Sequence, residues 1–148
     1  MDPFNLKSAL LAKHAQHVVL IHFPIALFLA GTGFDIAARW MRQSANRTTM
    51  MAAARINIIA AAVFVLPTIL SGVLAWQWAL QGAPLKGLVE LHLILGTAAG
   101  SLICLTAWLH FRQGTISHRY LLSLEVFTAA ILGLAAHIGG FLSGVNLA

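Results

Sequence analysis

The sequence predicts an all-α protein, a transmembrane four-helix bundle that forms a single integral membrane domain over residues 1–148. Hydrophobic residues make up 59% of the chain and charged residues only 9%, with a mean hydropathy of +0.85, which is more apolar than a soluble core of this size requires. Four long apolar runs account for most of the residues, and each can cross a hydrocarbon layer of about 30 Å as a helix. We therefore expect a multi-pass membrane protein in contact with a lipid bilayer.

The apolar runs predict spans at about 17–39, 56–80, 88–110 and 120–141, preceded by a leader at residues 1–16. Leucines alternate with lysines in the leader, which is typical of a short amphipathic helix in the membrane interface. Pro24 and Pro67 lie inside the first two spans. Because proline has no backbone N–H, Pro24 leaves the Leu20 carbonyl without its helical partner, and we expect a bend at each proline.

The distribution of positive charge predicts the orientation in the membrane. Arginines gather around the first and third connections between spans, at Arg39, Arg42, Arg47, Arg55, Arg112 and Arg119. The opposite side carries only Lys7, Lys13 and Lys86. The positive-inside rule then places both termini on the periplasmic side of a bacterial inner membrane. Because the basic residues are dispersed, no nucleic acid partner is expected.

Three histidines are predicted to lie at similar depth near the periplasmic face, each on a different span: His22, His92 and His137. An ionisable side chain inside a membrane is costly, and it commonly marks a functional site. Small residues share a helix face with each of them at steps of three or four, namely Ala26 and Ala30, Gly96 and Gly100, and Gly133 and Gly140. Such faces let a flat group or another backbone approach closely.

These features favour one b-type haem near the periplasmic face. Haem b needs neutral imidazoles on facing helices, apolar walls and small residues beside the macrocycle. We expect the axial ligands to come from His22, His92 and His137, with Lys86 or Lys13 near the propionates. The chain has no CxxCH motif, which excludes covalent c-type attachment.

Ligation by two imidazoles leaves no open position on the iron, so we expect electron transfer rather than oxygen chemistry. The protein is then an electron-transfer protein or subunit rather than a stand-alone enzyme. Quinone, a c-type cytochrome, a larger redox complex or a second copy of the chain are the partners that such a protein would use. The alternative is a non-redox protein in which His22, His92 and His137, with His17 in reserve, bind Zn or Cu or form a structural polar cluster.

The cytoplasmic half holds fewer polar groups inside the spans. Asp35 and Arg39 are four residues apart and are expected to pair on one helix face. Glu125 is expected to pair with Arg55 or to hydrogen-bond Asn57, and proton transfer is the alternative role. Two further histidines, His110 and His118, stand near a connection and are expected to be solvated.

Four segments carry a resemblance to a known family: His17-x4-His22-Phe-Pro-Ile-Ala-Leu, Ser71-Gly-Val-Leu-Ala-Trp76, Leu91-His92 and Ala136-His137-Ile-Gly139-Gly140. Together they resemble domain-of-unknown-function family 2231, predicted four-span bacterial membrane proteins, over nearly the whole chain. Val18 stands where the family usually has proline, and Ala75 where it has aspartate. The resemblance implies four spans but no established activity. The fusion of some members to c-type cytochrome modules implies a redox setting.

Overall fold

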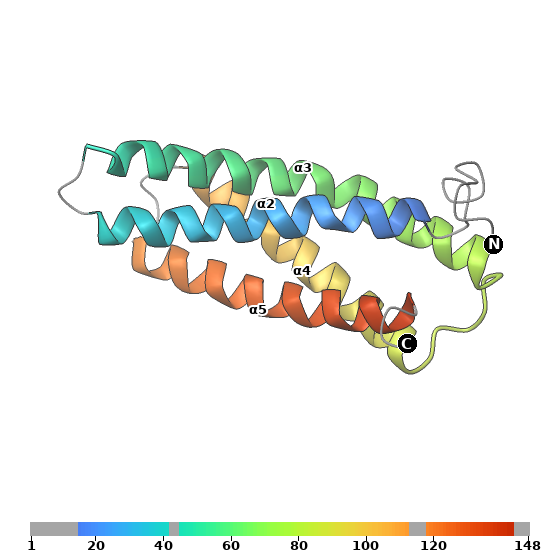
Figure 1. Cartoon of the computed structure of the whole chain (residues 1–148). Helices are drawn as coiled ribbons and strands as arrows, with labels where there is room; N and C mark the ends of the chain where they lie inside the picture. The colour runs from blue at the N-terminus through green and yellow to red at the C-terminus, as the bar shows by residue number, and fades with distance from the viewer. Residues whose placement is uncertain (1–14, 42–44, 113–117, 144–148) are drawn as a thin grey trace.

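The computed structural model describes residues 15–41, 45–112 and 118–143. Four helices span nearly all of them: α2 (Ala15–Trp40), α3 (Arg47–Ala79), α4 (Leu88–Phe111) and α5 (His118–Leu142). Each of the four is long and apolar enough to cross a membrane, which confirms the predicted all-α four-span fold (Figure 1). Most of the predicted leader lies outside the described residues.

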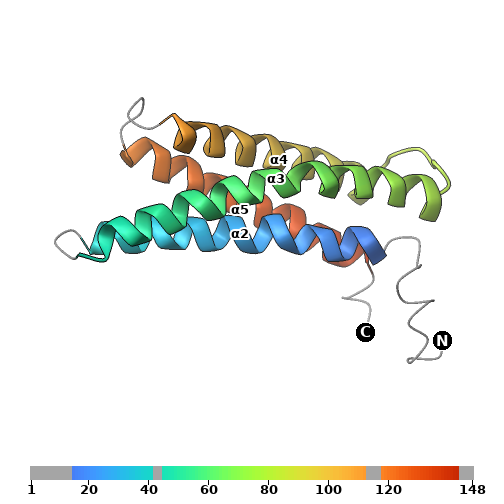
Figure 2. The same ribbon diagram turned by 90° about the horizontal axis from the view of Figure 1, so that it is seen from above.

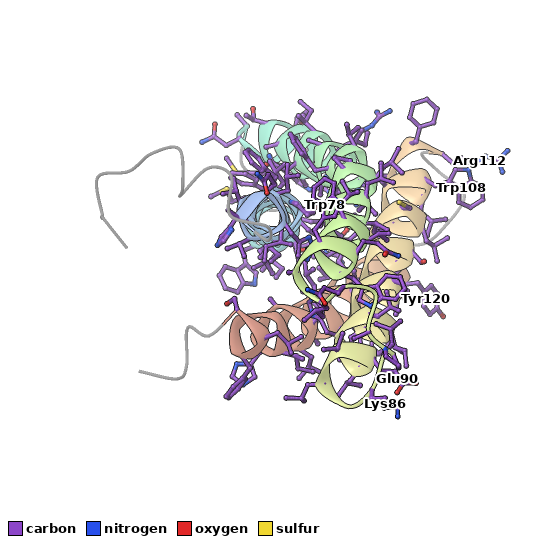
Figure 3. The ribbon with its side chains drawn as sticks, turned by 90° about the vertical axis from the view of Figure 1, so that its right-hand side faces the viewer. Trp78, Lys86, Glu90, Trp108, Arg112 and Tyr120 are labelled. Carbon is purple, nitrogen blue, oxygen red and sulfur yellow. The ribbon has the colours of Figure 1, made fainter. Side chains whose placement is uncertain are left out.

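The helices form two antiparallel hairpins, α2 with α3 and α4 with α5, which pack against each other through α3 with α4 and α2 with α5. Helices α2 and α4 therefore lie diagonally across the bundle. The view along the bundle in Figure 3 shows this order around the axis, and Figure 2 shows the hairpins from above. A core of Phe28, Ile58, Ala61, Val65, Ala99, Ile103, Ala107 and Leu132 fills the centre.

The antiparallel order gives the bundle two chemically different ends. We call the end with the starts of α2 and α4 and the last turns of α3 and α5 the His17 end, and the opposite end the Glu125 end. The α3–α4 connection lies at the His17 end, on the right in Figure 1. Arg39, Arg47, Arg55 and Arg112 belong to the Glu125 end, and Lys86 to the His17 end.

Three helices agree with the predicted spans to within two residues at each end, whereas α3 begins at Arg47 instead of about residue 56. The 33 residues of α3 extend over about 50 Å, which is longer than the hydrocarbon layer and its headgroups. The arginines at the start of α3 mark where its apolar segment ends. The helical hydrogen bonds continue past them, so the helix is longer than the apolar segment.

Both prolines sit inside uninterrupted helices. The Leu20 carbonyl, which Pro24 leaves without a helical donor, accepts a hydrogen bond of 3.3 Å from Thr68 Oγ1 of α3. A neighbouring helix thus satisfies the freed carbonyl, as membrane proteins require. The bends at Pro24 and Pro67 stay predictions.

The two hairpins repeat one burial pattern. Buried positions of α2 recur in α4 with a spacing of 75 residues: Pro24 and Ala99, Phe28 and Ile103, Gly31 and Thr106, Thr32 and Ala107, Asp35 and His110. Buried positions of α3 recur in α5 with a spacing of 67 residues: Ala54 and Leu121, Ile58 and Glu125, Ala61 and Thr128, Val65 and Leu132. The two hairpins therefore repeat one burial pattern along the chain, as internal structural repeats do.

Candidate functional site

His17, in the first turn of α2, is held against α3. Its Nδ1 lies 3.0 Å from Ser71 Oγ, and Ser71 Oγ donates its proton to the Thr68 carbonyl over 2.8 Å. Because the single hydroxyl proton of Ser71 is already used, we assign His17 Nδ1 as the donor and Nε2 as the nitrogen with the free lone pair.

His92, in the second turn of α4, is held in the same way against α5. Its Nδ1 lies 3.0 Å from the Ala135 carbonyl, which can only accept a hydrogen bond. Nδ1 therefore carries the proton, and Nε2 has the lone pair. A hydrogen bond from Nδ1–H to a carbonyl or hydroxyl is the usual support for an imidazole that binds a metal through Nε2.

A glycine makes room for each ring. A Cβ at Gly72 would lie 3.0 Å from His17 Cε1, and a Cβ at Gly139 would lie 2.9 Å from His92 Cε1. Gly72 and Gly139 are separated by the same 67 residues as the other equivalent positions of α3 and α5, and His17 and His92 by the 75 residues of α2 and α4. The two imidazoles therefore occupy the same site of two repeated hairpins.

The two rings meet edge to face across the bundle. Their centres are 6.3 Å apart and their planes are inclined at 77°. Two imidazoles on opposite sides of one metal ion, with metal–nitrogen bonds of about 2.0 Å, have ring centres about 6 Å apart. The distance between the ring centres is therefore the one that two imidazoles bound to a single metal ion would have. No group of three or more metal-ligating side chains is found among the described residues.

The other two predicted ligands point elsewhere. His22 is exposed, and its Nδ1 lies 2.6 Å from the Val18 carbonyl of its own helix. His137 is also exposed, and its ring meets the Phe141 ring edge-on with centres 5.0 Å apart. The structure brings His92 together with His17, the predicted reserve ligand, and with neither His22 nor His137.

The predicted small residues line different surfaces. A Cβ at Gly96 or Gly133 would meet nothing within 4 Å, while one at Gly100 would lie 3.0 Å from Val65 Cγ1 in the α3–α4 interface. Gly140 is half-buried and its carbonyl accepts a hydrogen bond from Ser143 Oγ. Lys86 is exposed in the α3–α4 connection, and Figure 3 shows it beside Glu90 at the outer edge of α4.

Sequence reasoning ranked His17 below His22 and gave no role at this site to Ser71, Gly72 or Gly139. Depth along a span places a side chain in the membrane but does not say which side of the helix it occupies. The spacing between repeats was the missing signal, since it relates His17 to His92 and leaves His22 without an equivalent histidine at Thr97.

The Glu125 end corrects two expectations. Glu125 is fully buried, and one carboxyl oxygen lies 2.7 Å from His110 Nε2, so its partner is neither Arg55 nor Asn57. His110 is buried rather than solvated. Arg55 lies over the Phe111 ring at 5.9 Å from its centre, and the side chain of Asn57 donates to the Ala53 carbonyl of its own helix.

The predicted pair of Asp35 and Arg39 is confirmed, with 3.4 Å between Oδ2 and the guanidinium. The side chain of His118 lies outside the described part of the chain, and its predicted solvation is therefore untested.

Fold and site together describe a multi-pass membrane protein built from two helical hairpins with one repeated burial pattern, in which the imidazoles of His17 and His92 occupy equivalent positions and meet each other. The chain belongs to the family described as predicted membrane protein (DUF2231), which it matches over residues 13–145. No curated protein and no solved structure matches the chain.

Proposed function

We propose that this protein is a b-type cytochrome-like electron-transfer protein, or a subunit of one, with a single haem between His17 and His92. One observation carries the proposal: two repeat-equivalent imidazoles on diagonal helices meet edge to face with centres 6.3 Å apart, and each donates its Nδ1 proton to a neighbouring helix. When bound, haem b supplies reversible one-electron redox chemistry, and ligation from both sides leaves no position for oxygen.

The surrounding residues orient the two ligands. Ser71 and the Ala135 carbonyl accept the Nδ1 protons, which fixes the tautomer and leaves the Nε2 lone pair available to bind a metal. Gly72 and Gly139 let the rings seat against α3 and α5. In this arrangement His17 takes the place that the sequence assigned to His22 or His137. Lys86, which the sequence predicts beside the haem propionates, lies at the same end of the bundle as His17 and His92.

We place the His17 end on the periplasmic side of a bacterial inner membrane, because the arginines of the described residues gather at the Glu125 end. Electrons then pass between this haem and quinone, a c-type cytochrome, or a neighbouring subunit or copy of the chain. A single cysteine at Asn46, on a Cys104→Ala background, tests the orientation. We expect impermeant maleimide to label it only from the cytoplasmic side, and labelling only from the periplasmic side reverses the orientation.

Metal and haem content of the purified protein tests the cofactor. After expression with adequate haem supply, we expect one iron per chain and the reduced-minus-oxidised absorption bands of a low-spin b-type haem. Stoichiometric zinc or copper without iron supports the metal-binding alternative instead. Absence of metal together with a featureless visible spectrum contradicts both the haem proposal and the metal-binding alternative. That outcome leaves a structural pair, for which each Nδ1 hydrogen bond already provides a partner.

A further inference from the structure

The Glu125 end holds a second pair of ionisable side chains that the proposed haem does not use. His110 Nε2 and Glu125 Oε1 are 2.7 Å apart, and the exposed fractions of the two side chains are 9% and 0%. With an ionised carboxylate and a neutral imidazole, this pair has a net charge of −1. A net charge buried among hydrocarbon is costly. One added proton brings the net charge to zero, as an ion pair or as a neutral acid and base.

Other charged groups near the pair do not supply that compensation. From α2, Asp35 and Arg39 both act on Glu125 electrostatically, but they pair with each other and their charges cancel. Helix α3 contributes Arg55 at this end, and its guanidinium lies over the Phe111 ring. On α4, the only ionisable group in contact with Glu125 among the described residues is His110 itself.

The second carboxyl oxygen of Glu125 also indicates that the pair holds an added proton. Glu125 Oε2 is buried and has no hydrogen-bond partner among the described residues. An ionised carboxylate spreads its charge over both oxygens, so a buried one needs partners at both. In the neutral acid one oxygen donates its proton to the imidazole and the other is only a carbonyl, which costs less to leave unpaired.

We propose that the His110–Glu125 pair is a proton-binding site that exchanges one proton with water at the Glu125 end through His110. The pair takes a proton from hydronium and leaves water. His110 is the exchange route because its side chain is the part of the pair that reaches the surface. A proton rather than a metal ion is the occupant, since the described residues bring no three metal-ligating side chains together.

This site stands apart from the proposed haem. His92 and His110 are 18 residues apart on one helix, or about 27 Å. Charges at that distance interact by less than about 1 kcal/mol even at an effective dielectric constant near 20. The proposal of proton binding at Glu125 can therefore be tested independently of the proposal of haem binding at His17.

Infrared difference spectroscopy of the full-length protein in lipid nanodiscs tests the proposal. We expect the carbonyl band of a protonated carboxylic acid at neutral pH, shifted in D₂O and absent in Glu125→Gln. The exposed Glu90→Gln is the matched control and leaves the band unchanged. Absence of the band in the wild type at neutral pH, or its survival in Glu125→Gln, overturns the proposal. Glu125→Asp must move the band rather than remove it, which keeps the test valid if the glutamine variant folds poorly.

The exchange route has its own test. His110→Gln keeps a side chain that can hydrogen-bond the carboxyl but cannot relay a proton. We expect the acid band to remain and its shift in D₂O to develop at least about tenfold more slowly. A purely structural pair predicts no change in this rate, so an unchanged rate in His110→Gln rules out His110 as the route.

Discussion

The two ends of the bundle differ in how similar the residues are at equivalent positions of the two hairpins. At the His17 end both hairpins keep the same arrangement, with a histidine seated on a glycine and bonded to the neighbouring helix. At the Glu125 end the equivalent positions have diverged: Asp35 corresponds to His110, and Ile58 to Glu125. Both ends carry buried polar groups, but only one of them is symmetric.

This difference distinguishes a site that both hairpins form together from a pair of residues that lies within one hairpin. Equivalent side chains of two repeats that meet between the hairpins suit one ligand held by both hairpins. Different side chains at equivalent positions satisfy each other within one hairpin, as His110 and Glu125 do. The symmetry of the His17 end is therefore the main structural argument for a bound group there.

Glu125→Ala gives the largest expected loss of stability. It leaves a cavity and a buried His110 imidazole without its partner, which together cost about 2–5 kcal/mol. Unfolding of the variant in detergent should show this loss, while the exposed Glu90→Ala changes stability by less than about 0.5 kcal/mol. The double variant His110→Leu with Glu125→Leu should recover most of the loss, because apolar replacement of a whole buried pair is often neutral. A double variant as unstable as Glu125→Ala contradicts this account.

The two glycines at the His17 end should respond alike. Alanine at Gly72 or Gly139 brings a Cβ to about 3 Å from an imidazole, and such overpacking costs about 1–3 kcal/mol. Each variant should also lose haem to a similar degree. Gly133→Ala is the matched control, because its Cβ meets nothing within 4 Å. A loss at Gly139 with none at Gly72 breaks the proposed equivalence of the two hairpins.

Thr68→Val gives the smallest expected effect. It removes the hydroxyl that serves the Leu20 carbonyl freed by Pro24, and side-chain hydrogen bonds between membrane helices average about 0.6 kcal/mol. Thr97→Val serves as the control, since the exposed Thr97 hydroxyl bonds only to carbonyls of its own helix. Equal unfolding free energies for these two variants show that the α2–α3 hydrogen bond contributes nothing.

The sequence predicts the helices well because membrane spans are set by length and hydropathy, which are properties of single segments. It identified the pair of Asp35 and Arg39 and the Leu20 carbonyl that needs a partner, while His92 as a haem ligand stays a prediction. It did not identify the partner of Glu125, because which helices are neighbours depends on packing. His110 and Glu125 flank the α4–α5 connection, so the hairpin brings them together, while Asn57 lies on the diagonal helix α3.

The central claim is that His17 and His92 are the two ligands of one haem. Reduced-minus-oxidised absorption spectra of four single variants, each normalised to folded protein, test it most directly. We predict that His17→Ala and His92→Ala lose the low-spin b-type spectrum, while His22→Ala and His137→Ala keep the wild-type bands. A normal spectrum in His17→Ala, or its loss in His22→Ala or His137→Ala, would contradict the account.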